Sequence, residues 1–170
     1  MRVIGIVGRK HVGKTTLVER LVAEIAGRGL SVSTVKHTHH AIDLEHPGTD
    51  TDRHRAAGAA EVMLASASRW ALMREHRGAG EPALADLVGR LAPVDLVIVE
   101  GFSRSAHPKL EVVRLAQSRD LIAPGDPTVR ALAASPFPLP EELASGRPAL
   151  ALDDIAGLAD LALAEARALA

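Results

Sequence analysis

The sequence predicts a three-layer α/β fold in which helices flank a mostly parallel β-sheet. The first observation is a strand–helix–strand order at the start of the chain. A β-branched run at Arg2–Val7 precedes an amphipathic helical pattern and a second short apolar run at residues 30–35. The second observation is the run DLVIV at residues 95–99, which is apolar after Asp95 and suits a strand buried on both faces. Such units place their strands in parallel and pack helices against the sheet.

The helix between the first two strands shows the 3.6-residue period of an amphipathic helix. Leu17, Leu21 and Ile25 form one row along its surface, and Val18 and Val22 form the next. The pattern begins near residue 14 and stops at two glycines, which favour helix termination. The long polar segment that follows the second strand, residues 36–52, is expected to be a functional loop.

The rest of the chain predicts shorter elements by the same two periodicities. Two of them, the strands expected at residues 61–65 and 69–74, are close enough to be neighbours or a hairpin. No repeat divides the chain, so residues 1–170 are expected to form a single P-loop nucleotide-binding domain, for the reasons given below. The further strands are expected at residues 61–65, 69–74, 109–115, 129–133 and 149–152, and the helices at residues 52–59, 81–91 and from a cap at 153–154 to the C-terminus.

Composition excludes several classes of protein. The 20 basic and 21 acidic residues give a net charge of −1, which argues against a nucleic-acid binder, and three aromatic residues are too few for base stacking along a strand. The absence of cysteine excludes disulfides, thiolate-ligated metals and cysteine nucleophiles. No apolar run approaches the ~20 residues that cross a bilayer, and the N-terminus lacks a signal-peptide pattern. We therefore expect a cytoplasmic protein that binds neither nucleic acid nor a membrane.

A phosphate-binding motif follows the first strand. The pattern G-x-x-x-x-G-K-[ST] is matched by Gly8-Arg9-Lys10-His11-Val12-Gly13-Lys14-Thr15. Its glycines allow turns that point successive amide N–H groups inward, and the positive end of the following helix completes an anion cradle. Lys14 is expected to reach the β- and γ-phosphates, Thr15 to place its hydroxyl on Mg²⁺, and Thr16 to lie beside the α-phosphate. The motif predicts a P-loop nucleotide-binding protein.

Glu100 is the expected partner of the P-loop in metal chemistry. Ligands of parallel sheets sit at the carboxyl ends of the strands, and Glu100 ends the strand that Asp95 begins. Glu100 would therefore bind Mg²⁺ directly or through water, or orient an attacking water molecule, whereas Asp95 would lie far from the phosphates. Lys14 and Glu100 are the expected catalytic residues. A simple solvent-exposed carboxylate is the alternative for Glu100.

The polar loop leaves the second strand at the same edge of the sheet. Lys36 and His37 are expected near the phosphates, and Asp43 or Asp50 could supply a second carboxylate to the Mg²⁺ shell. Arg53 could bind an anion. Asp50 or Thr51 could equally be the N-cap of the next helix, and Arg53 part of a solvated face.

The histidines of this loop allow a metal site as an alternative. His37 and His39 would share one side of an extended chain, and imidazole suits Ni²⁺ and Zn²⁺. Because neither a cysteine nor a helical histidine pair accompanies them, we favour contact with phosphate or hydrogen bonds that hold the loop.

Taken together, these segments resemble the MobB family of molybdopterin-guanine dinucleotide biosynthesis accessory proteins. The resemblance covers residues 2–115, and its most specific part is VKHTHHAIDLEHPGTDTDRHRAAGA at residues 35–59, alongside the P-loop, DLVIVEGF and PKLEVVR. The chain departs from the family at Ala41-Ile42, where an acidic–aromatic pair is common, and at Thr49, where lysine is common. Positions that match the family motifs are Gly8 to Thr16, Lys36, His37, Asp43, Pro47, Gly48, Asp50, Arg53, Glu100, Gly101, Lys109, Glu111 and Arg114.

The resemblance implies a dimeric P-loop protein of GTPase type that binds GTP with Mg²⁺. It also implies that the protein assists the molybdenum cofactor guanylyltransferase and works with other cofactor-maturation proteins, with at most weak GTP hydrolysis. An ATP-dependent ligase or kinase of dethiobiotin-synthetase type and a nickel-metallochaperone GTPase are the alternatives. The Asn-Lys-x-Asp run that selects guanine in many GTPases is absent, so the base preference rests on the resemblance.

Overall fold

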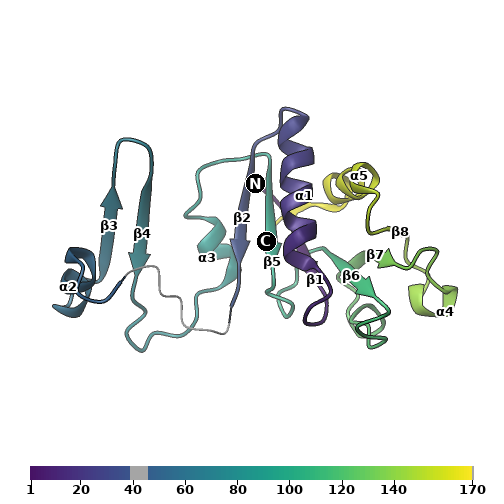
Figure 1. Ribbon diagram of the computed structural model, residues 1–170. Coiled ribbons are helices and arrows are strands. Elements are labelled where there is room, and N and C mark those ends of the chain that lie inside the picture. The colour runs from purple at the N-terminus through teal and green to yellow at the C-terminus, as the bar shows by residue number, and fades with distance from the viewer. Residues whose placement is uncertain (39–45, 170) are drawn as a thin grey trace. The chain divides into compact units, whose positions relative to one another are not determined.

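Residues 1–38 and 46–169 are described by the computed structural model, and Figure 1 traces them. The chain divides into two units, which are described in turn. The first unit combines Met1–His37 with Leu84–Ala170, and the second is Thr38–Ala83. Asp43, a predicted magnesium ligand, and His39 lie outside the described residues.

A seven-stranded sheet forms the centre of the first unit. Its strands follow the order β2-β5-β1-β6-β7-β8, all parallel, and β9 pairs antiparallel with β1. The predicted mostly parallel sheet is therefore confirmed, and β5 lies between the two strands that α1 connects. The strands are β1 (Arg2–Val7), β2 (Val32–Lys36), β5 (Leu96–Glu100), β6 (Lys109–Arg114), β7 (Val129–Ser135), β8 (Ala149–Ala151) and β9 (Arg167–Ala168).

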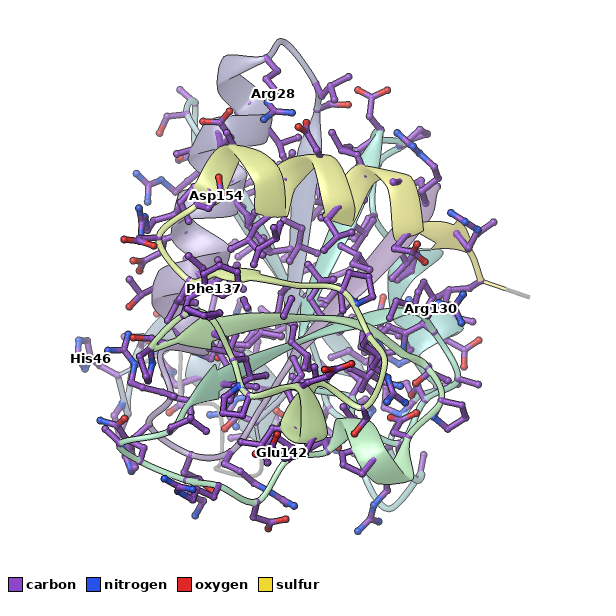
Figure 2. The ribbon with its side chains drawn as sticks, turned by 90° about the vertical axis from the view of Figure 1, so that its right-hand side faces the viewer. Arg28, His46, Arg130, Phe137, Glu142 and Asp154 are labelled. Atoms are coloured by element: carbon purple, nitrogen blue, oxygen red, sulfur yellow. The ribbon has the colours of Figure 1, made fainter. Side chains whose placement is uncertain are left out.

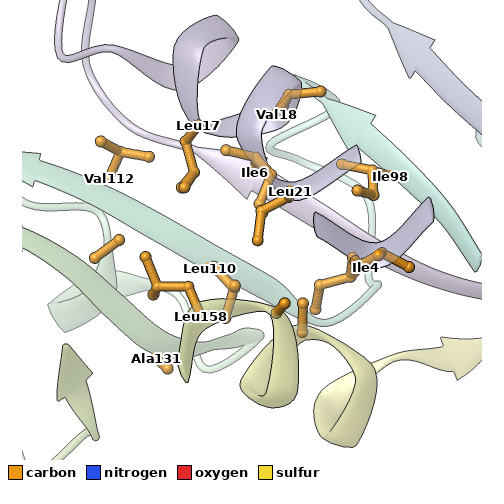
Figure 3. Close-up of a cluster of buried hydrophobic side chains, with 14 of the residues drawn as sticks. Ile4, Ile6, Leu17, Val18, Leu21, Ile98, Leu110, Val112, Ala131 and Leu158 are labelled. Carbon is orange, nitrogen blue, oxygen red and sulfur yellow. The ribbon is translucent and has the colours of Figure 1, made fainter. Parts of the chain in front are cut away.

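Helices cover both faces of this sheet. On one face α1 (Lys14–Gly27) and α5 (Ile155–Glu165) pack against β1, where Ile4 and Ile6 meet Leu21 and Leu158 in a fully buried cluster (Figure 3). The opposite face carries α3 (Leu84–Val88), η1 (Ala123–Gly125) and α4 (Glu141–Ala144) over a second set of valines and leucines. Alternate residues of β1 thus enter opposite cores, which explains why its sequence is apolar from Val3 to Val7.

The second unit contains one helix and one hairpin. The helix α2 (Asp50–Ala56) is followed by β3 (Glu61–Ala65) and β4 (Trp70–Arg74), which pair antiparallel with Met63 opposite Leu72. Of the two arrangements expected for these strands, neighbours or a hairpin, the structure shows the hairpin. The helix begins two residues earlier than expected, because its N-cap is Thr49 and neither Asp50 nor Thr51.

Several element boundaries differ from the sequence prediction. The strand β5 includes Glu100, and α3 spans five residues, where the periodicity predicted residues 81–91. The C-terminal helix ends at Glu165, and the next residues form β9, which was not predicted. The strand β6 pairs only with Gly5–Val7, so β9 satisfies the remaining backbone of β1 at Arg2 and Val3. The short helix α4 was also not predicted.

Among the described residues, no helix combines the length and the apolar character that crossing a membrane requires.

Candidate functional site

The loop between β1 and α1 has the backbone of an anion cradle. Gly8 adopts φ 146° and Gly13 adopts φ 97°, both in the range that favours glycine. A Cβ at Gly8 would lie 2.7 Å from the carbonyl oxygen of Val112, so no side chain fits there. Leu17 is the residue of α1 that donates back to Gly13, at 3.0 Å, which leaves the first three helical amides available to a ligand. The first turn of α1 carries no acidic side chain to oppose an anion.

Lys14 folds back over this loop. Its Nζ donates to the carbonyl oxygens of Gly8 at 3.0 Å and Arg9 at 2.8 Å. Partial burial lowers the pKa of Lys14, an effect that Glu100 opposes and Lys36 reinforces. The ammonium is thus held at the mouth of the cradle, where the sequence motif places it.

Three strands and α1 bring Thr15, Glu100 and Lys36 together. The hydroxyl of Thr15 donates to Glu100 Oε1 at 2.8 Å. Lys36 Nζ lies 3.3 Å from Thr15 Oγ1 and 3.4 Å from Glu100 Oε2. Lys36 and Glu100 are cross-strand neighbours of β2 and β5, and β5 pairs in turn with β1. The Thr15 hydroxyl and the Glu100 carboxylate, both predicted to face Mg²⁺, are therefore adjacent, and the Lys36 ammonium contacts each of the two groups.

The segment after β5 is fixed by a close backbone approach. Gly101 adopts φ 98°, and a Cβ there would lie 2.9 Å from the Cβ of His37. The amide of His37 donates to the Glu100 carbonyl oxygen at 2.8 Å, and its ring lies 4.6 Å from the ring of Phe102. These contacts hold the ends of β2 and β5 together and so position the Glu100 carboxylate. Asp95, at the other end of β5, instead accepts hydrogen bonds from the amide and hydroxyl of Ser31.

A cavity of about 270 Å³ opens beside the loop. Its lining includes Lys10, Lys14, Gly101 and Ser103. Arg9 also borders it, but its guanidinium forms an ion pair with Asp120 at 2.7 Å. The cavity is large enough for a phosphate-sized group next to the Lys14 ammonium.

Other predicted residues lie in varied surroundings. Lys10, His11 and Thr16 are exposed along the loop and the first turn of α1, whereas the Val12 side chain is buried beneath the loop. Asp50 and Arg53 lie on α2 in the second unit, where their side chains are 3.8 Å apart. Their role in nucleotide binding stays a prediction. Among the residues that the structure describes, no group of three histidine or carboxylate side chains could hold a metal ion.

Two contacts that position the loop were not expected from sequence. Asp120 holds Arg9, and Arg114 Nε donates to the Val12 carbonyl oxygen at 3.3 Å from the end of β6. Both contacts join residues more than 100 positions apart, so no local pattern could predict them. Glu111 is buried and accepts the amides of Ile122 and Ala123 at 2.7 Å each. Burial raises its pKa, the two amides lower it, and the carboxylate fastens η1 beside β6.

Comparison with known proteins identifies the family. The family described as "MobB: Molybdopterin guanine dinucleotide synthesis protein B" matches residues 3–135. The chain belongs to the MobB family. The molybdopterin-guanine dinucleotide biosynthesis adapter protein of Escherichia coli (strain K12) is 36% identical over 159 residues, which are 87% of this chain and 83% of that protein.

Solved MobB structures share this fold over nearly the whole chain. A crystal structure of molybdopterin-guanine biosynthesis protein B superposes with a TM-score of 0.74 at 25% identity, covering 95% of this chain and 98% of that one. A MobB homologue from Bacillus stearothermophilus gives a TM-score of 0.67 at 28% identity, covering 96% of each chain. The MobB family match ends at β7, and these structures extend the likeness over α4, β8 and α5.

Proposed function

We propose that the protein is an adapter in molybdopterin-guanine dinucleotide biosynthesis that binds GTP with Mg²⁺ at its P-loop. In this role it assists the guanylyltransferase that attaches the guanine nucleotide to molybdopterin. The observation that carries the proposal is the cluster of Lys14, Thr15, Lys36 and Glu100 around a glycine-shaped anion cradle. The Escherichia coli relative, named as a molybdopterin-guanine dinucleotide biosynthesis adapter protein, supports the pathway.

Each residue of the cluster would have its own role in holding a nucleotide. The loop amides and Lys14 would bind the β- and γ-phosphates, and Thr16 would meet the α-phosphate. Thr15 and Glu100 present oxygen ligands, which Mg²⁺ prefers, and the bound ion would neutralise phosphate charge. Lys36 would then exchange its contacts with these oxygens for a phosphate oxygen, since an ammonium and a metal ion repel each other at one carboxylate.

Hydrolysis of GTP is expected to be slow. Fast phosphoryl transfer needs a cation that stabilises charge in the transition state, such as an arginine finger. Among the described residues of the first unit, Arg9 borders the phosphate cavity, but Asp120 holds its guanidinium. The site therefore suits binding and presentation of a nucleotide better than rapid turnover.

Calorimetric titration of the purified protein with GTP and with ATP, each with Mg²⁺, tests the proposal. We expect GTP to bind more tightly than ATP. Lys14→Ala should abolish binding, because it removes the ammonium at the mouth of the cradle. Arg69→Ala, which removes an exposed cation in the β3–β4 turn, is the matched control and should bind as the wild type does.

Each outcome of this titration is informative. Unchanged GTP affinity in Lys14→Ala, with the fold verified by circular dichroism, would show that the loop does not bind the phosphates. A clear preference for ATP would contradict the guanine part of the proposal and favour an ATP-dependent ligase or kinase.

We also propose that the protein forms a homodimer through the β3–β4 hairpin. Met63 and Leu72 face each other across the two strands, and Trp70 follows on the same face. These side chains are 59%, 42% and 65% exposed, respectively. A two-stranded hairpin is marginally stable alone, and an exposed apolar face is typical of an interaction site. A second copy of the same face would cover it with matching apolar side chains.

Sedimentation equilibrium measures the proposed dimer. Trp70→Ser should shift the protein toward the monomer, because it removes the largest apolar side chain of that face. Leu64→Ser, on the opposite face of the same strand pair, is the control and should leave the dimer intact. A wild-type protein that is monomeric at all concentrations would refute this interface without affecting the nucleotide proposal.

A further inference from the structure

A second cavity, of about 360 Å³, lies at the carboxyl ends of β7 and β8. Its lining includes Arg20 on α1, Ser135 and Phe137 after β7, and Asp153 after β8. Figure 2 shows Phe137 and Asp154, at the start of α5, on one side of the unit, and Arg130, at the start of β7, on the other. The cavity is thus on the edge of the parallel sheet where the P-loop follows β1, and this edge is where such sheets bind ligands.

Two connections join this cavity to the phosphate cradle. Arg114 lines the cavity while its Nε donates to the Val12 carbonyl oxygen, and its Nη2 lies 3.5 Å from the Cβ position of Gly13. Thr16 and Arg20 are four residues apart on α1 and therefore lie on one face of the helix. A nucleotide with its α-phosphate at Thr16 would run along this face toward the cavity, roughly one helical turn away.

The cavity carries an aromatic surface and an acidic acceptor. Phe137 is 49% exposed although it is apolar, and prolines on both sides restrict the backbone that presents it. Asp153 and Asp154 are adjacent but differ in their contacts. Asp154 caps α5 by accepting the amide of Gly157 at 3.0 Å, whereas no described residue donates a hydrogen bond to the Asp153 carboxylate. The Asp153 carbonyl oxygen accepts from Arg20 at 3.4 Å, which keeps a cation beside it.

These groups complement the edge of guanine. Guanine presents N1–H and N2–H₂ donors, which a carboxylate accepts, together with O6 and N7 acceptors, which a guanidinium donates to. Adenine presents an N6 amino donor where guanine has O6, so a donor would face the guanidinium groups. The N1 atom of adenine is an acceptor, so it would face the carboxylate without a hydrogen bond. An exposed ring such as that of Phe137 stacks on either purine and adds affinity without selecting between them.

We propose that this cavity is the purine-base subsite of the nucleotide site and that Asp153 selects guanine there. The inference rests on the proposed binding of GTP at the P-loop and assigns the base contact that the chain otherwise lacks. Phe137 is the stacking surface, and Arg20 and Arg114 face the O6 and N7 side of the base.

The test exchanges the hydrogen-bonding character of Asp153. Binding of GTP, ATP, xanthosine triphosphate and inorganic triphosphate, each with Mg²⁺, is measured by calorimetry for the wild type and for Asp153→Asn. An asparagine amide can donate to the O2 oxygen of xanthine, where guanine has its N2 amino group. We therefore expect Asp153→Asn to lose about tenfold or more in GTP affinity and to prefer xanthosine triphosphate over GTP.

Two further variants control the experiment. Asp154→Asn alters the neighbouring carboxylate but keeps a good helix cap, so its nucleotide preference should equal that of the wild type. Phe137→Ala should weaken all three purine nucleotides by a similar factor and leave inorganic triphosphate unchanged. Because inorganic triphosphate has no base, its binding to Asp153→Asn also verifies that this variant is folded.

The results separate this inference from the function on which it rests. If Asp153→Asn keeps the wild-type ratio of GTP to xanthosine triphosphate affinity while both proteins bind inorganic triphosphate, the base subsite is wrong and the phosphate site stands. If the wild type binds neither triphosphate nor nucleotide, the phosphate site is refuted, and the base subsite with it.

Discussion

The buried histidine at the amino end of β6 predicts a specific loss of stability in acid. His107 is 1% exposed, and among the described residues neither of its ring nitrogens has a hydrogen-bond partner of good geometry. Burial is the main cause that lowers its pKa from 6.5 to about 4, and the charge of Lys109 lowers it further. Asp126 and the Ser105 backbone act in the opposite direction but are weaker.

The size of the effect follows from these two pKa values. Between pH 6.5 and pH 4 the unfolded chain binds a proton at His107 that the folded chain does not, so the free energy of unfolding rises with pH in this window. The contribution is complete above pH 6.5 and is lost as the pH falls toward 4. At pH 5 the unfolded state gains about 30-fold in population relative to neutral pH, which corresponds to about 2 kcal/mol.

Urea denaturation at pH 7.5 and pH 5 measures this difference. His107→Leu replaces the ring by an apolar side chain that does not titrate. Between the two pH values its free energy of unfolding should therefore fall by about 2 kcal/mol less than that of the wild type. His76→Leu changes an exposed histidine and should follow the wild type. An equal fall in the free energy of unfolding for the wild type and His107→Leu would show that the ring takes up its proton as readily in the folded state as in the unfolded state. That result would refute the reasoning.

Two further substitutions test how the ends of the strands build the site. Glu100→Gln should weaken Mg²⁺-dependent nucleotide binding by about tenfold or more in calorimetry, because it removes the charge beside Thr15, whereas Asp95→Asn, at the other end of β5, should leave this binding unchanged. Equal effects would mean that Glu100 does not face the metal. Gly101→Ala should destabilise the protein by about 1–3 kcal/mol in urea denaturation, because of its positive φ and the contact with His37. Gly27→Ala, where a Cβ meets nothing within 4 Å, is the control, and a similar loss in both variants would refute the strain.

Elements whose signal is local could be predicted from the sequence. The apolar rows of α1, the buried strands β1 and β5 and the glycine-bearing turn between β1 and α1 each depend on neighbouring residues and a fixed spacing. The position of Glu100 beside the loop that follows β1 could also be predicted, because strand direction in a parallel sheet decides which end of β5 lies at that edge.

The parts that could not be predicted depend on contacts between distant residues. The strand β9 exists because β6 leaves the backbone of Arg2 and Val3 unpaired. A strand of two residues is too short to show a sequence pattern of its own. The contact of Lys36 with Thr15 requires the pairing of β2 with β5 and of β5 with β1. The position of Asp153 beside α1 could not be predicted either, because it depends on the order of strands across the sheet.

The insertion of β5 between β1 and β2 has a consequence for how the protein folds. The strand–helix–strand segment at the start of the chain can form its helix early, since its contacts are short in sequence, but its two strands cannot pair with each other. Glu100 meets Thr15 only when a segment 85 residues further along enters that gap. Closing so long a loop is entropically costly and slow. The loop between β1 and α1 should therefore meet Glu100 only in a late folding step, and under the proposed function a nascent chain should acquire nucleotide affinity only after β5 has docked.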